Sequence, residues 1–181
     1  GRGVSARATC DGAFFRDQRV AVVGGGDTAV EEAIYLAGLC SHVTLIHRRD
    51  TLRAGQVLQD RLFERINIDV IWDTAVEGIG GDGEAVTGLK LRNLKTGAEK
   101  MLEVDGLFVA IGHNPATELV ASKIATDAQG YVKTVSGSTR TSIDGFFAAG
   151  DVQDPHYRQA ITAAASGCMA ALDAERFLNG L

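Results

Sequence analysis

Hydrophobic residues gather in short runs along the chain, and strand-like runs alternate with stretches of helical spacing. Residues 19–24 (RVAVVG) are typical of a buried parallel strand, and residues 43–47 and 68–72 repeat that pattern. Between these runs, residues 27–39 and 56–66 carry apolar side chains at helical spacing. The order strand, helix, strand predicts βαβ units and therefore a parallel sheet.

The rest of the chain changes pattern several times. Residues 75–105 alternate apolar and polar positions between glycines, which predicts an antiparallel meander, and residues 107–112 return to a buried run. After an irregular stretch, residues 145–151 (GFFAAGD) predict another strand and residues 158–178 predict a last helix. We therefore expect an α/β protein: a three-layer Rossmann-like domain with an antiparallel meander, followed by a strand–helix segment.

Composition narrows the function classes. Apolar residues make up 45% and charged residues 23% of the chain, which is ordinary for a globular protein. The net charge of −5 gives no reason to expect nucleic acid or an anionic membrane surface as partner. Three cysteines are few and odd in number, which favours a reducing, cytoplasmic location over a secreted disulfide framework. The chain opens with Gly1 rather than Met and shows no signal-peptide pattern, so we expect a trimmed or partial chain.

A glycine turn directly follows the first predicted strand. The sequence GGGDTA fits the pattern G-x-G-x-x-A, in which glycines allow a tight turn and the approach of a pyrophosphate. The following helix supplies N–H donors and the positive end of its dipole. Because this glycine motif lies inside a βαβ unit, it favours dinucleotide binding over a ligand-free turn. The predicted pyrophosphate-binding residues are Gly24, Gly26, Asp27, Thr28 and Ala29.

A basic cluster follows the second predicted strand. An acidic residue at this place holds the ribose 2′-hydroxyl of NAD, whereas arginine suits the 2′-phosphate of NADP. This chain has His47, Arg48 and Arg49, with Arg53 four residues further, and Asp50 lies past the strand end. Three guanidiniums can surround a dianionic phosphate through forked hydrogen bonds. A solvated basic edge is the alternative, but the position favours NADPH over NADH.

Five stretches of the chain together resemble the low-molecular-weight thioredoxin reductases, which are NADPH-dependent flavoproteins. The stretches are ATCDG (8–12), VAVVGGGDTAVEEA (20–33), HRRDTLR (47–53), GLFVAIGHNP (106–115) and the block 145–178. The resemblance implies that residues 1–112 form an NADPH-binding domain and that residues 113–181 form the C-terminal segment of an FAD-binding domain. It also implies electron transfer from NADPH to FAD, then to a Cys-x-x-Cys disulfide and to thioredoxin, within a homodimer.

The resemblance extends to residues outside the glycine turn and the basic cluster. It places Gly112, His113 and Pro115 at the domain junction. It places Gly150 and Asp151 at the ribityl and phosphate part of FAD. The start of the last helix would contact the flavin ring, where a helix N-terminus favours negative charge on reduced flavin. The residues implied at that helix start are Arg158, Gln159 and Ala160.

The chain departs from the family at its redox motif. Where the family has Cys-Ala-Thr-Cys, this sequence has Arg7-Ala-Thr-Cys10, and disulfide exchange needs two thiols. Cys10 and Asp11, the family's proton donor, are the candidate catalytic residues, and Arg7 occupies the position of the partner cysteine. Cys40 and Cys168 are expected to be packing residues.

A second departure concerns length, because the family's N-terminal half with its own FAD-binding glycine motif is absent from this sequence. The FAD site is therefore expected to be incomplete, and the C-terminal segment is expected to expose apolar surface unless a partner covers it. We consider three functions: a partial thioredoxin reductase, an NADPH-dependent flavin oxidoreductase with a non-dithiol acceptor, and a non-enzymatic NADPH-binding module.

Overall fold

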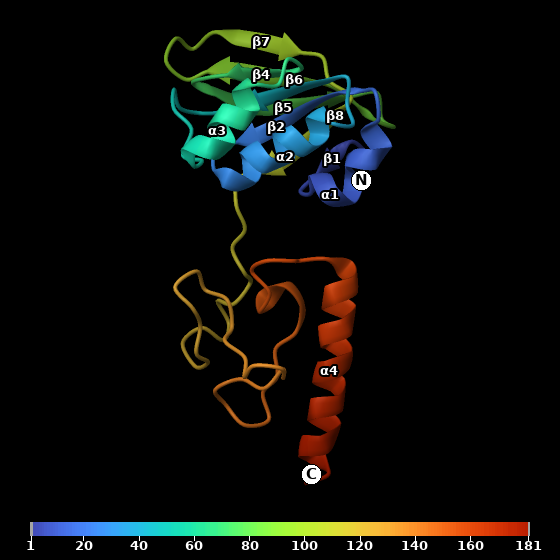
Figure 1. Ribbon diagram of the computed structural model, residues 1–181, viewed down its shortest axis with the longest axis vertical. Coiled ribbons are helices and arrows are strands. Elements are labelled where there is room, and N and C mark those ends of the chain that lie inside the picture. Colours follow the sequence, from blue (N-terminus) through green and yellow to red (C-terminus); the bar gives the residue numbers. More distant parts are fainter. Residues whose placement is uncertain (1, 181) are drawn as a thin grey trace. The chain divides into compact units, whose positions relative to one another are not determined.

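The computed structural model describes residues 2–180 (Figure 1). The chain divides into two compact units, residues 1–112 and residues 113–181. Two hydrophobic clusters lie in the first unit and a small third cluster lies in the second. The units have the bounds of the two predicted domains, whose cofactor assignments remain predictions.

A five-stranded parallel sheet forms the centre of the first unit, with the strand order β1-β8-β2-β3-β4. Its strands are β1 (Val4–Ser5), β2 (Arg19–Gly24), β3 (His42–Ile46), β4 (Ile68–Ile71) and β8 (Gly106–Ala110). Helix α2 (Asp27–Ala37) connects β2 to β3, and helix α3 (Gln56–Phe63) lies between β3 and β4. These elements confirm the βαβ order predicted from the apolar runs.

The alternation of side chains along β2 shows how the sheet is covered on both faces. Val20 and Val22 belong to a buried cluster with residues of α2, among them Ala33, whereas Ala21 belongs to a second cluster with Leu89. Leu89 lies in a three-stranded antiparallel sheet, so helices cover one face of the parallel sheet and this second sheet covers the other (Figure 1). The strands of this antiparallel sheet are β5 (Thr74–Gly81), β6 (Val86–Asn93) and β7 (Glu99–Leu102). The predicted three-layer arrangement and meander are confirmed.

The first unit differs from the prediction near its N-terminus and in helix α3. The pairing of β1 with the edge of β8 was not predicted, and neither was the short helix α1 (Ala8–Asp11), which leads into a 3₁₀ turn over Gly12–Phe15. Helix α3 ends at Phe63 rather than at residue 66, and only Leu62 of this helix is buried. The apolar spacing overstated the helix because Ile66 is exposed rather than packed on the sheet.

The second unit holds a 3₁₀ turn over Gly150–Val152 and the long helix α4 (Ala160–Leu178). The strand predicted over residues 145–151 is wrong: only an isolated bridge joins Phe147 to Arg140, and the 3₁₀ turn begins at Gly150. A strand needs a neighbour to share its hydrogen bonds, and the bridge to Arg140 is the one β-bridge that the described residues offer to residues 145–151.

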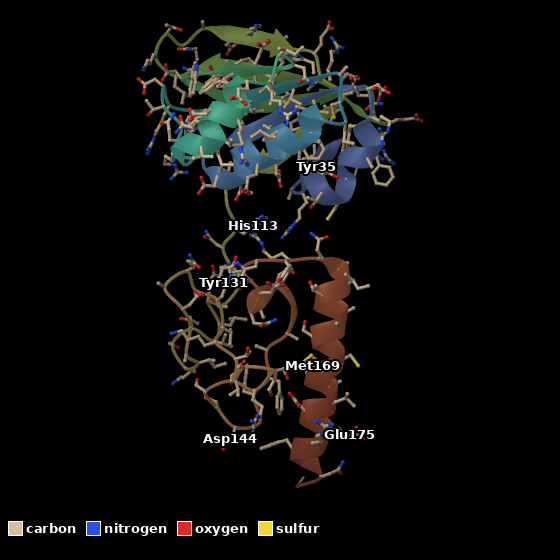
Figure 2. All side chains as sticks on the ribbon, in the orientation of Figure 1. Tyr35, His113, Tyr131, Asp144, Met169 and Glu175 are labelled. Carbon is tan, nitrogen blue, oxygen red and sulfur yellow. The ribbon has the colours of Figure 1, made fainter. Side chains whose placement is uncertain are left out.

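Helix α4 has no buried residue in the part of the chain that the structure describes. Its exposed apolar side chains include Ile161, Leu172 and Met169, the last of which is labelled in Figure 2. Cys168 is also exposed, so its prediction as a packing residue is wrong, whereas Cys40 is buried as predicted. These exposed apolar side chains confirm the expectation that the C-terminal segment exposes apolar surface.

Candidate functional site

Three consecutive glycines lead from β2 into α2, and their surroundings differ. Gly24 ends β2 and Gly26 is the N-cap residue of α2. A Cβ atom on Gly24 would overlap Ala29 and the carbonyl oxygen of Ala110. A Cβ atom on Gly25 would overlap the imidazole ring of His47, whereas one on Gly26 would meet nothing within 4 Å. The first two glycines are therefore required by packing, and the third leaves an open approach to the start of α2. The role of Gly25 was not predicted, because the motif leaves that position unspecified.

The N-terminus of α2 fits an anionic ligand. Gly26 is the N-cap residue and supplies no side-chain cap, and its carbonyl oxygen accepts hydrogen bonds from the N–H groups of Ala29 and Val30. The first N–H groups of a helix lack intrahelical acceptors and carry the positive end of the dipole. Asp27 and Thr28 open the helix beside Gly26, in the order that the motif requires. The open space at Gly26 is suited to a pyrophosphate.

Two backbone contacts tie the basic loop after β3 to the glycine turn. The N–H of Arg53 donates to the carbonyl oxygen of Gly25 at 2.7 Å, and the N–H of Gly55 donates to Oδ1 of Asp27 at 2.8 Å. The carboxylate of Asp27 thus fixes the loop in place. As an anion it would repel a pyrophosphate, so its contribution to a nucleotide site is to position neighbouring groups.

His47 lies beneath the glycine turn. Its side chain is 4% exposed, its Nε2 lies 3.0 Å from the carbonyl oxygen of Thr51, and its ring makes an edge contact with Trp72 at a centroid distance of 6.3 Å. These contacts hold the start of the basic loop against the sheet. The structure therefore gives His47 a supporting position, with its ring packed between Gly25 and Trp72.

A cavity of about 380 Å³ joins the glycine turn to the basic loop. Gly24 and Gly25 line it together with His47, Arg48 and Arg53. Its apolar wall is formed by Val23, Ile46, Val76 and Ile111. The lining brings Gly24 and Gly25 together with two of the three predicted arginines, and the third, Arg49, is exposed and is not among the lining residues. The other predicted residues of the glycine turn also do not line this cavity: Gly26, Asp27, Thr28 and Ala29.

The predicted redox motif occupies the short helix α1. Arg7 is the N-cap residue of this helix, and Cys10 lies three positions further on the same side, exposed to solvent. The N–H of Arg7 donates to Oγ of Ser5 at 3.0 Å, which links the turn to β1. Asp11 is half-buried at the helix end. Two cysteines at positions 7 and 10 would face each other across one turn, but here position 7 presents a guanidinium.

A second, smaller cavity of about 200 Å³ lies within residues 113–181. His113, Tyr131, Asp151 and Arg158 line it, and Figure 2 labels the first two. Arg158 has φ +46°, and its N–H donates to Oδ2 of Asp154 at 3.1 Å. The Nε atom of Arg158 is buried and has no hydrogen-bond partner among the described residues. A buried donor of this kind is suited to an acceptor on a bound group, so the residues present fit a polar cofactor such as FAD.

The remaining predicted residues of the second unit lie close to that cavity in the chain. Gly150 has φ +73°, and its N–H donates to Oγ of Ser166 at 2.9 Å, which holds the 3₁₀ turn against α4. Gln159 is the N-cap residue of α4 and forms a capping box with Thr162, and Ala160 is the first helical residue. Gly112, with φ +103°, ends the first unit.

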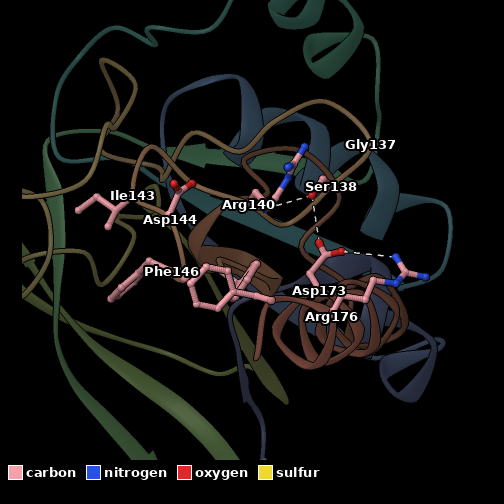
Figure 3. Close-up of a pocket in the computed structure, with 11 residues that line it drawn as sticks. Gly137, Ser138, Arg140, Ile143, Asp144, Phe146, Asp173 and Arg176 are labelled. Carbon is pink, nitrogen blue, oxygen red and sulfur yellow. Dashed lines mark hydrogen bonds and ion pairs between the residues drawn. The ribbon is translucent and has the colours of Figure 1, made fainter. Parts of the chain in front are cut away.

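Another hollow of the second unit, of about 520 Å³, is lined by residues of α4 and of the loop before the 3₁₀ turn (Figure 3). Asp173 of α4 accepts hydrogen bonds from the hydroxyls of Ser138 and Thr139 at 3.0 and 2.8 Å and from the N–H of Thr139 at 3.1 Å. The bonds from Thr139 lower the pKa of Asp173. Arg176 lies 3.9 Å from the same carboxylate. This network attaches the loop to the helix and was not predicted from the sequence.

The fold and the glycine turn are those of a Rossmann-like protein, and comparison with known proteins identifies the family. Residues 3–167 match the family described as pyridine nucleotide-disulphide oxidoreductase, and the chain belongs to that family.

Similar proteins include several thioredoxin reductases. The chain is 55% identical over 181 residues to the thioredoxin reductase of Rickettsia conorii, covering 99% of this chain and 58% of the relative. It is also 55% identical to that of Streptomyces coelicolor, covering 100% of this chain and 56% of the relative. The crystal structure of thioredoxin reductase from Streptococcus pyogenes superposes with a TM-score of 0.92 at 46% identity, covering 99% of this chain and 58% of that one. The resemblance found in the sequence is confirmed, and the chain spans less than three-fifths of the length of these relatives.

No helix within residues 2–180 is long and apolar enough to cross a membrane. The same residues contain no group of three or more His, Cys, Asp or Glu side chains that could hold a metal ion.

Proposed function

We propose that residues 1–112 bind NADPH in the cavity between the glycine turn and the basic loop. The observation that carries this proposal is that Gly24 and Gly25 line the same cavity as Arg48 and Arg53. A pyrophosphate at the start of α2 and a 2′-phosphate at the two guanidiniums would occupy opposite parts of one ligand. The apolar wall of the cavity is suited to the nucleoside between them.

Each part of the site has a separate task in this proposal. The N-terminus of α2 supplies uncharged N–H donors to the pyrophosphate, with Gly26 leaving room for its approach. Arg48 and Arg53 supply charge-assisted bonds to the 2′-phosphate, and Arg49 adds positive charge at the rim. His47 and Asp27 hold the loop in register with the turn.

For the whole protein we propose the reaction after which its relatives are named. NADPH would supply a hydride to FAD, which passes the electrons to a disulfide and so to thioredoxin. In the second unit, Arg158, Gln159 and Ala160 would contact the flavin ring. Gly150 and Asp151 would contact the ribityl and phosphate part of FAD, and His113 would lie at the domain junction. We propose the cytoplasm as its location and a homodimer as its assembly.

The redox turn favours a second candidate for this particular chain. With Arg7 at the position of the partner cysteine, Cys10 cannot complete a dithiol cycle within this turn. A flavin oxidoreductase that passes electrons to a non-dithiol acceptor is consistent with that turn, and so is a module that only binds NADPH. Both alternatives retain the NADPH site.

The NADPH proposal is tested by removing the two guanidiniums one at a time. Arg48→Ala and Arg53→Ala should each weaken NADPH binding by about 1–3 kcal/mol, or roughly fivefold to 150-fold, because each removes a charge-assisted bond. NADH binding should change little. Arg65→Ala is the matched control, since it removes an equal charge from an exposed residue beyond α3. Equal losses of NADPH and NADH affinity would contradict the assignment of the 2′-phosphate.

The flavin proposal is tested by the visible spectrum of the purified chain mixed with FAD without oxygen, before and after addition of NADPH. A protein-bound flavin band that bleaches with NADPH supports a working flavin site in residues 113–181. Absence of bound flavin would restrict this chain to NADPH binding.

A further inference from the structure

The hairpin between β6 and β7 reaches the basic loop through one side chain. Lys95 lies in the turn of this hairpin, and its Nζ donates to Oδ2 of Asp50 at 2.9 Å and lies 3.0 Å from Oδ2 of Asp73. Asp50 directly follows the arginines of the basic loop, and Asp73 lies between β4 and β5. One ammonium group thus pairs with two carboxylates that belong to different segments.

Backbone hydrogen bonds hold the same three segments together. The N–H of Asp73 donates to the carbonyl oxygen of Arg49 at 3.1 Å, and the N–H of Leu94 donates to the carbonyl oxygen of Asp73 at 2.6 Å. Within the hairpin turn, Oδ1 of Asn93 accepts a hydrogen bond from the N–H of Lys95 at 3.0 Å. Lys95 is therefore presented to the basic loop by an ordered turn.

The charges matter because Asp50 is an anion next to the predicted phosphate ligands. The hydrogen bond from Lys95 lowers the pKa of Asp50, and the bonds to Asp50 and Asp73 raise the pKa of Lys95, so the pair of Asp50 and Lys95 is held in its charged form. Without Lys95, the carboxylate of Asp50 would be able to pair with a neighbouring arginine. An arginine paired in this way would be lost to a phosphate, and the uncompensated carboxylate would repel that phosphate.

We propose that Lys95 is a positioning residue that sets the preference for NADPH over NADH, by holding Asp50 away from the arginines that receive the 2′-phosphate. This inference rests on the proposed NADPH function. It concerns specificity more than stability, because ion pairs exposed to solvent contribute little to folding. Nothing in the family pattern of the glycine turn or of the basic loop includes Lys95.

The test compares Lys95→Met with Asp50→Asn and with the double variant. NADPH and NADH affinities are measured by quenching of the fluorescence of Trp72, the one tryptophan of the chain. Lys95→Met should weaken NADPH by about threefold to tenfold and leave NADH within about twofold. Adding Asp50→Asn to Lys95→Met should restore the NADPH affinity of Asp50→Asn, because the competing carboxylate is gone.

The control is Lys100→Met, which removes the same charge from an exposed lysine on β7. It should leave the ratio of the two affinities unchanged. The loss caused by Lys95→Met should shrink at high salt, since the groups involved are exposed. An equal loss for both cofactors, or no rescue by Asp50→Asn, would overturn the role of Lys95. A wild-type chain with no preference for NADPH would overturn the proposed function as well, so the two failures are distinguishable.

Discussion

Adjacent glycines in the turn after β2 should respond in opposite ways to the same added methyl group. Gly25→Ala should destabilise the first unit, because its Cβ would overlap the buried ring of His47. Gly26→Ala should leave the fold nearly unchanged, because its Cβ would meet nothing within 4 Å and its φ of −97° is allowed for alanine. The open space that tolerates the methyl group is the space proposed for the pyrophosphate.

The magnitudes follow from the two environments. Overpacking a filled site costs about 1–3 kcal/mol, and the ring of His47 has little room to move because its Nε2 is held at the carbonyl of Thr51 and its edge meets Trp72. For Gly26→Ala the cost is limited to exchanging a glycine N-cap for alanine, at most about 1 kcal/mol. In a domain of about 100 residues, each kcal/mol lowers the melting temperature by roughly 4–8 °C.

Two measurements on the full chain separate these effects. Thermal unfolding followed by Trp72 fluorescence reports on the first unit, which contains the one tryptophan of the chain. NADPH affinity is measured by calorimetry at a temperature where both variants are folded. We expect Gly25→Ala to lose melting temperature and Gly26→Ala to lose affinity by about tenfold or more, or about 1.4 kcal/mol. A Gly25→Ala variant as stable as wild type, or a Gly26→Ala variant that binds NADPH normally, would refute the steric reasoning.

Further predictions concern the redox turn, the buried thiol and the second unit. Arg7→Cys should form a disulfide with Cys10, so that mild oxidation removes two titratable thiols, whereas Arg7→Ser should lose none; an unchanged thiol count in Arg7→Cys would contradict the geometry of α1. Burial raises the pKa of Cys40 to about 11, so the unfolded state releases this proton first and stability should fall between about pH 9 and pH 11. Cys40→Ala should remove that part of the pH dependence, and identical slopes in the two proteins would contradict it. Asp173→Ala should speed hydrogen exchange at the Thr139 amide, measured by NMR at pH 7. Because the pKa of Asp173 is lowered, its protection of that amide should persist to below about pH 3.9 and vanish in stronger acid; equal exchange in both proteins would contradict the network.

Much of the first unit could be predicted because the apolar runs of its sequence coincide with strands and helices that pack in its core. After the exposed Arg19, the run of β2 from Val20 to Val23 is apolar at every position and packs on both faces, which is typical of an inner parallel strand. The short strand β1 carries no such signal, because its two residues pair only with the edge of β8. Its existence depends on a partner about a hundred residues away in the chain.

The second unit could be predicted less well. The apolar run over residues 145–151 indicated a strand, but a run of this kind becomes a strand only where a neighbour accepts its hydrogen bonds. The exposed apolar side chains of α4, by contrast, agree with the expectation that this segment exposes apolar surface. The failed strand depends on a partner that the local sequence does not contain.

The candidate site shows the same division between local and distant information. The glycine turn was evident from the motif G-x-G-x-x-A. Arg48 was evident from its place directly after the second predicted strand. The supporting position of His47 beneath Gly25 was not evident, since it depends on the path of the backbone. The contact of Lys95 with Asp50 joins residues 45 positions apart, and no local pattern indicates it.

The central claim, that this cavity holds NADPH by its 2′-phosphate, is tested most directly by NMR of the labelled chain with NADPH and with NADH. The amide resonance of Gly26 should shift with both cofactors, because both carry a pyrophosphate. The side-chain Nε–H resonances of Arg48 and Arg53 should shift with NADPH and remain in place with NADH. Arginine resonances that do not respond to NADPH, or that respond equally to both cofactors, would contradict the claim.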